Sequence, residues 1–115
     1  MKLNLSCIDI SIGDLIQCSF GLSRQELNIF LNLLNETGWV SISSIAKAAK
    51  RDRSVVQRAL LSLNSKELVE RDHKNLARGG YEYLYRAKDK KTVKKAILEK
   101  SRSFSLMIQN QIDQW

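Results

Sequence analysis

The sequence predicts a mainly helical α+β fold with a small β-hairpin and a long C-terminal helix. Two observations lead to this prediction: apolar residues recur at helical spacing in several segments, and two strand-like runs flank one polar, glycine-containing connection. With 115 residues, 43% hydrophobic and 27% charged, the chain has the size and composition of one compact globular domain. We expect it to fold without disulfides or metal.

The first helix is expected from about residue 8 to residue 19. Gly21 follows at a position that suits the left-handed residue at a helix C-terminus. The alternation of Leu3, Leu5 and Cys7 is also compatible with a short strand, so this segment keeps two interpretations. The apolar residues with helical spacing are Ile8, Ile12, Leu15 and Ile16.

A second helix is predicted after Ser23. Ser23 and Glu26 have the spacing of a capping box, in which each side chain binds the backbone N–H of the other residue. We expect the helix to bury one apolar stripe and to end at Thr37-Gly38. The stripe consists of Leu27, Phe30, Leu31 and Leu34.

Two further helices should follow a short strand at residues 39–42. A cap at Ser43 or Ser44 is expected to begin the third helix, and Asp52 is placed to cap a fourth helix over residues 53–65. The apolar side of the fourth helix fits one sector about 100° wide, which leaves its polar side free. The apolar members are Val56, Ala59, Leu60 and Leu63, and Ser54, Arg58 and Leu61 lie opposite them.

Two strands are expected at residues 68–72 and 81–86, joined by a basic tip at residues 73–80. Tyr81, Tyr83 and Tyr85 then share one face of the hairpin. Such a stripe can stack on unpaired bases, but we favour packing of the hairpin onto the domain.

A short helix, a tight turn, a second helix with a polar face and a two-stranded hairpin together make a winged helix-turn-helix. Four motifs stand out within this arrangement: Leu22-Ser23-Arg24-Gln25-Glu26, Ile42-Ser43-Ser44-Ile45-Ala46, Arg53-Ser54-Val55-Val56 with Leu60 and Leu63, and Lys66-Glu67-Leu68-Val69-Glu70. Through these motifs the sequence resembles, over residues 12–87, the archaeal and bacterial TrmB-like regulators and, more distantly, MarR-like proteins. The resemblance implies a homodimer that binds operator DNA.

Double-stranded DNA is therefore the expected partner, with the fourth helix in the major groove and the hairpin, or wing, on the backbone or minor groove. The charge distribution agrees, because residues 1–37 carry a net charge of −2 and residues 38–115 a net charge of +9. Base contacts are assigned to Arg53, Ser54, Gln57 and Arg58, and phosphate contacts to Lys47, Lys50, Arg51, Lys74 and Arg78.

The segment from Asp89 to Trp115 is expected to form the last helix and to pair with the same helix of a second copy. Packing of this helix on its own domain is the alternative. The organisation predicted is a winged-helix domain over residues 1–87 and a dimerisation element over residues 88–115. The expected interface residues are Val93, Ile97, Phe104, Met107, Ile108, Ile112 and Trp115.

No enzyme, metal or cofactor site is expected. His73 is the only histidine, and the sequence has no glycine-rich phosphate loop, nucleophile–base pair or apolar carboxylate pair. Cys7 and Cys18 are interpreted as buried free thiols of a cytoplasmic protein, with redox sensing as the alternative. No membrane span is expected, because no apolar stretch approaches the roughly 20 residues needed to cross a bilayer. No small-molecule effector is expected, since the resemblance covers no effector domain. A winged helix that binds a protein partner within a larger transcription or chromosome complex is the rival function.

Overall fold

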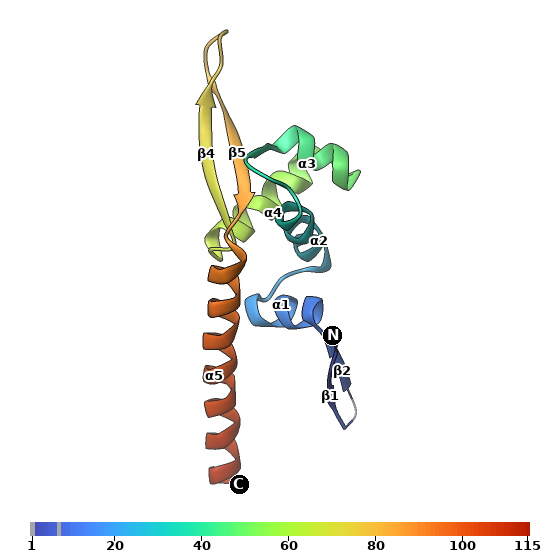
Figure 1. Cartoon of the computed structure of the whole chain (residues 1–115), viewed down its shortest axis with the longest axis vertical. Coiled ribbons are helices and arrows are strands. Elements are labelled where there is room, and N and C mark those ends of the chain that lie inside the picture. The colour runs from blue at the N-terminus through green and yellow to red at the C-terminus, as the bar shows by residue number, and fades with distance from the viewer. Residues whose placement is uncertain (1, 7) are drawn as a thin grey trace. The chain divides into compact units, whose positions relative to one another are not determined.

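The computed structural model describes residues 2–6 and 8–115 and confirms a mainly helical α+β winged-helix fold with a long C-terminal helix (Figure 1). The described residues form two compact units, one from residues up to Gly21 together with Asp89–Trp115, and one from Leu22–Lys88. The elements in chain order are β1 (Lys2–Leu5), β2 (Ile8–Ser11), α1 (Ile12–Phe20), α2 (Arg24–Leu34), β3 (Val40–Ser41), α3 (Ile42–Ala49), α4 (Arg53–Ser65), β4 (Val69–Asn75), β5 (Tyr81–Ala87) and α5 (Lys90–Gln114).

The first unit begins with an antiparallel hairpin of β1 and β2, in which Lys2 pairs with Ser11. The strand interpretation is thus correct for the start of the chain, and the helix predicted from residue 8 begins only at Ile12. Ser11 sets this boundary, because its hydroxyl accepts the backbone N–H of Asp14 while the Asp14 carboxylate accepts the Ser11 N–H, both at 3.1 Å. Gly21 closes α1 with a φ of 65°, as predicted.

The 25-residue helix α5 completes the first unit. Asp89 caps it by accepting the Lys91 backbone N–H at 2.9 Å and the Thr92 hydroxyl at 3.2 Å. Helix α1 packs against α5, and the Lys100 ammonium lies 5.1 Å from the centroid of the Phe20 ring. Beyond Ile97, every residue of α5 is exposed.

The second unit packs α2, α3 and α4 with a three-stranded antiparallel sheet of order β3-β5-β4 (Figure 1). The apolar side of α4 is the one predicted, and in the core this helix packs against α2, α3 and β4. The largest fully buried side chains are Tyr85, Phe30, Ile29, Leu60, Leu63, Leu68, Val56 and Val69.

Two predicted helix boundaries are wrong by a few residues. Helix α2 ends at Leu34 rather than at Gly38, and Ile29 and Leu33 are buried where the stripe predicted Leu31 and Leu34, which are half-buried. Ser41 caps α3 in place of Ser43 or Ser44, because its hydroxyl accepts the Ser44 N–H at 3.2 Å.

Helix α4 has the predicted bounds, and Asp52 occupies the N-cap position without a side-chain cap hydrogen bond. The wing is longer than predicted, since β4 continues to Asn75 and pairs there with Tyr81. The tip is therefore only residues 76–80, in which Gly79 and Gly80 have φ angles of 91° and 77°.

Candidate nucleic-acid interface

The turn between α3 and α4 is tight and contains one residue, Lys50, in the left-handed backbone conformation. Lys50 has a φ of 54°, and the backbone N–H of Arg51 donates to the Ala46 carbonyl at 3.1 Å, which closes the end of α3. Ile42 and Ile45 are buried and hold α3 against α4. Arg53 and Ser43 lie across the turn from each other, with 3.5 Å between the Arg53 Nη1 and the Ser43 Oγ. This is the compact helix-turn-helix that the sequence predicts.

The outer face of α4 brings together the predicted base-reading residues. Arg53, Ser54, Gln57 and Arg58 are all exposed: Ser54 and Arg58 lie opposite the buried side of the helix, and Arg53 and Gln57 lie on its flank. Leu61, one turn further on, is 46% exposed and continues the same face as an apolar side chain. Helix α4 contains two arginines and no carboxylate, so its exposed face is both polar and positively charged.

The predicted phosphate-binding residues of the helix-turn-helix lie at its surface. Lys47, Lys50 and Arg51 are exposed on α3 and the turn. Between Ile42 and Ser65 the sequence has five basic residues and one acidic residue, Asp52. The surface around α4 is therefore suited to a polyanion.

The wing places its predicted residues differently from the sequence interpretation. Lys74 lies within β4, directly across from Glu82, and not at the tip, whereas Arg78 is in the tip and exposed. Tyr85 is 1% exposed and packs the base of the wing onto the domain as predicted, but Tyr81 is 57% exposed. The tyrosine stripe thus leaves the core as it approaches the tip.

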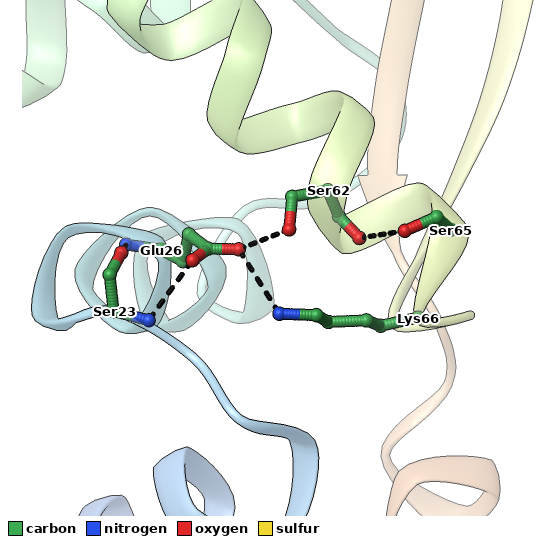
Figure 2. A network of polar contacts seen from close by, with 5 residues as sticks. All are labelled: Ser23, Glu26, Ser62, Ser65 and Lys66. Atoms are coloured by element: carbon green, nitrogen blue, oxygen red, sulfur yellow. Dashed lines mark hydrogen bonds and ion pairs between the residues drawn. The ribbon is translucent and has the colours of Figure 1, made fainter.

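Glu26 joins two helices in a polar network that sequence reasoning missed (Figure 2). Its carboxylate accepts the Ser23 backbone N–H at 3.0 Å and the Ser62 hydroxyl, and its Oε2 lies 3.6 Å from the Lys66 Nζ. The Ser65 hydroxyl donates to the Ser62 carbonyl at 2.7 Å. The capping-box motif identifies Glu26, but no local signal connects it to a serine 36 residues away.

The same network determines the acidity of Glu26. Partial burial by itself raises the pKa of this carboxyl group, but the hydrogen bonds from Ser62 and Ser23 and the positive charge of Lys66 together outweigh burial, so the pKa is lowered. The carboxylate is therefore stabilised in its charged form between the N-terminus of α2 and the C-terminal turn of α4.

Helix α5 divides its predicted interface residues into two groups. Val93 and Ile97 are buried within the single chain, so they are not available to a second copy. The remaining residues of the set are exposed, at 61% for Phe104, 60% for Met107, 45% for Ile108, 62% for Ile112 and 104% for Trp115.

Among the described residues, Cys18 and the possible metal ligands form no further site. Cys18 is exposed, which corrects the interpretation of a buried thiol, and Cys7 lies outside the described residues. In the part of the chain that the structure describes, no three histidine, cysteine, aspartate or glutamate side chains gather as a metal site. None of the described helices is long and apolar enough to cross a bilayer.

Comparison with known families and structures places this helix-turn-helix among transcriptional regulators. The model of the family described as sugar-specific transcriptional regulator TrmB matches residues 16–91. The chain belongs to the TrmB family. A relative in Methanocaldococcus jannaschii, the uncharacterised protein MJ1503, is 35% identical over 103 residues, which cover 86% of this chain and 77% of the relative. MJ1082 of the same organism, also uncharacterised, is 42% identical over 79 residues, 69% of this chain and 64% of the relative.

Solved structures of other proteins share this fold. A possible transcriptional regulator from Methanosarcina mazei has a TM-score of 0.91 and 28% identity over 100% of this chain and 97% of its own. A mutant of S. aureus MepR bound to an oligodeoxyribonucleotide has a TM-score of 0.55 and 18% identity over 90% of this chain and 73% of its own, a likeness of fold alone. The resemblance to TrmB-like regulators predicted from the sequence is confirmed.

Proposed function

We propose that this TrmB-family protein is a homodimeric regulator that binds double-stranded DNA sequence-specifically, with α4 in the major groove. One observation carries the proposal: the exposed face of α4 is polar and cationic along its first two turns while its opposite face is fully packed. An α-helix with its side chains is about 10–12 Å across, which matches a major groove about 12 Å wide.

The residue types on α4 suit base recognition. Arg53 and Arg58 can each donate two hydrogen bonds to guanine, and Gln57 can both donate to and accept from adenine. Ser54 reaches a phosphate or a base edge, and Leu61 can contact a thymine methyl group. Lys47, Lys50, Arg51 and Arg78 are assigned to phosphates, where they add affinity without reading sequence.

The exposed end of α5 supports the homodimer. Counted at 100° per residue, Phe104, Ile108, Ile112 and Trp115 lie in the same sector of about 100° as the buried Val93 and Ile97. The apolar stripe that α1 helps to cover near the start of α5 therefore continues uncovered to its end. Monomeric soluble proteins usually avoid such strips, and a second copy of the helix about a two-fold axis would bury this one.

Selection of binding sites from a random duplex pool tests the proposal with the full chain. We expect enrichment of a two-fold symmetric sequence whose half-sites are about 34 Å apart, one turn of duplex. Enrichment of a single half-site would contradict the dimer. Absence of duplex binding even at low salt would overturn the DNA-binding function and favour a protein partner for the α4 face, which Leu61 makes partly apolar.

A further inference from the structure

The two faces of the wing differ in chemistry. In an antiparallel pair, directly opposed residues share a face, so the register of β4 and β5 assigns every side chain to one side. One side, here the aromatic face, consists beyond its buried base of Arg71, His73, Asn75, Tyr81 and Tyr83. The other, here the mixed-charge face, consists of Glu70, Asp72, Lys74, Glu82, Leu84 and Arg86.

The mixed-charge face is poorly suited to a polyanion. Its three carboxylates outnumber its two cations. Arg86 is already engaged, since its Nε lies 2.7 Å from the Glu70 Oε2 and its guanidinium lies 4.3 Å from the centroid of the Trp39 ring. Lys74 lies directly across from Glu82, and cross-strand neighbours of opposite charge attract each other. A phosphate approaching this face would meet net negative charge.

By register the aromatic face has no carboxylate among its own residues, the nearest being that of Asp72, whose Oδ1 lies 4.0 Å from the His73 Nδ1, and its rings contact one another in series. The Arg71 guanidinium lies 4.4 Å from the centroid of the Tyr83 ring. Tyr83 meets Tyr81 edge to face at 5.2 Å, and Tyr81 meets His73 at 5.5 Å. Arg71, His73 and Tyr81 are nevertheless exposed, so their polar groups remain accessible to a partner.

The hydroxyl of Tyr81 is exposed and neutral. It lies 3.4 Å from the Tyr83 hydroxyl, within hydrogen-bond distance. The hydrogen bond between the two hydroxyls, together with the proximity of Tyr83, raises the pKa of Tyr81, so this phenol keeps its proton at neutral pH and can donate it to a partner. A neutral phenol beside a guanidinium is a pair of donors that fits phosphate oxygens.

The aromatic face also continues the surface that packs on α4. At the base of the wing, Val69 and Tyr85 belong to the same side of the sheet and are each 1% exposed, and β4 contacts α4 there. Towards the tip this side of the sheet leaves the core and becomes exposed. The aromatic face is therefore continuous with the packed side of the sheet at its base and open to a partner beyond it.

We infer that the aromatic face of the wing, through Arg71 and Tyr81, is a phosphate-contacting surface for duplex DNA. The inference rests on the proposed DNA-binding function and makes it more specific. It moves the main wing contact from Lys74, on the mixed-charge face, to Arg71. Arg78, in the tip, belongs to neither face and keeps its predicted role.

Fluorescence anisotropy of the full chain with one labelled duplex, over a series of salt concentrations, tests the assignment. Arg71→Ala should lower the affinity about tenfold and reduce the slope of log Kobs against log salt by about 0.9, the value for one phosphate neutralised. Arg71→Gln, which keeps the stem of the side chain over Tyr83, should show the same reduction. Tyr81→Phe should lower the affinity about threefold and leave the salt slope unchanged, since only a neutral hydrogen bond is removed.

Lys74→Ala is the matched control, because it removes one exposed cation from the same strand on the opposite face. We expect its salt slope to equal that of the unmodified chain. A slope reduced by Lys74→Ala and not by Arg71→Ala would overturn the inference while leaving the DNA-binding function intact. Variants that weaken binding of a single-stranded oligonucleotide but not of the duplex would also overturn it, and would assign the tyrosines to base stacking. Failure of the unmodified chain to bind duplex at low salt would instead refute the function itself.

Discussion

The Ser62 hydroxyl donates a hydrogen bond to the Glu26 carboxylate and so fixes the last turn of α4 to the first turn of α2. Glu26 thereby serves two helices at once, as the N3 residue of the α2 capping box and as the acceptor that orients the C-terminal end of α4. Because the proposed recognition surface is on α4, this hydrogen bond helps to set the angle at which that surface is presented.

Glu26→Gln should lower the free energy of unfolding at pH 7 by about 1 kcal/mol, because it weakens the charge-assisted hydrogen bonds and removes the ion pair with Lys66. The pH dependence follows from the lowered pKa of Glu26. A carboxyl group with a depressed folded-state pKa stabilises the fold above its unfolded value near 4.3, and this contribution is lost as the pH falls through the folded value. The difference in the free energy of unfolding between the unmodified chain and Glu26→Gln should therefore become smaller from pH 7 toward pH 3.

Urea unfolding at a series of pH values measures this difference. Glu36→Gln is the control, because it replaces an exposed carboxylate. A difference that stays constant with pH would contradict the assigned role of Glu26.

Arg58→Ala and Gln57→Ala should each reduce discrimination between the selected duplex and a random duplex by about 1–3 kcal/mol, because each substitution removes one bidentate pair of hydrogen bonds to a base. Both residues are exposed, so the fold should be preserved. Competition binding with the two duplexes measures the ratio, and Lys47→Ala is the control, since removal of a phosphate-binding group should weaken both duplexes equally. If all three variants lose affinity equally for the selected and the random duplex, α4 is not the recognition helix.

Binding of random duplex should weaken steeply as salt increases, because each neutralised phosphate releases condensed counterions. If Lys47, Lys50 and Arg51 all bind phosphates, replacing the three by alanine should reduce the slope of log Kobs against log salt by about 2.7. Titrations between low and physiological ionic strength give this slope. A flat dependence for the unmodified chain would be incompatible with a phosphate-binding surface.

Ile108→Asp should shift the protein toward a monomer, because it places a charge in the apolar stripe of α5 that we assign to the second copy. Leu106→Asp is the matched control, because Leu106 is also exposed, at 61%, and lies in the same turn of α5. It lies about 200° around the helix from Ile108 and so outside the apolar stripe. Sedimentation at tens of micromolar should show a dimer for the control and a monomer for Ile108→Asp. A monomer for the unmodified chain would exclude the α5 dimer.

Truncation after Arg102 should give a folded monomer with strongly reduced duplex affinity. The buried Val93 and Ile97, and the whole of Leu22–Lys88, are retained in this variant. Each half-site would then be bound alone, without the gain in effective concentration that a dimer provides. Circular dichroism checks the fold, and unchanged affinity for the selected duplex would show that dimerisation through α5 is not needed for binding.

Local sequence patterns determined many of the helix bounds and helix caps of this protein. The bounds of α4, its buried side, the capping box of α2 and the left-handed Gly21 follow from interactions within about four residues of each position. The family resemblance is carried by the same local motifs.

Tertiary structure decided what local patterns leave open. The strand at Ile8–Ser11, where a helix was predicted, depends on the pairing of β2 with β1, and the length of the wing depends on cross-strand pairs that extend to Asn75. The Ser62–Glu26 hydrogen bond joins residues 36 positions apart, and the register of β4 with β5 separates Lys74 from Arg71. The physical reason is the same in each case: a helix is stabilised by neighbours in sequence, whereas strand register and helix-to-helix packing depend on residues that only the folded chain brings together.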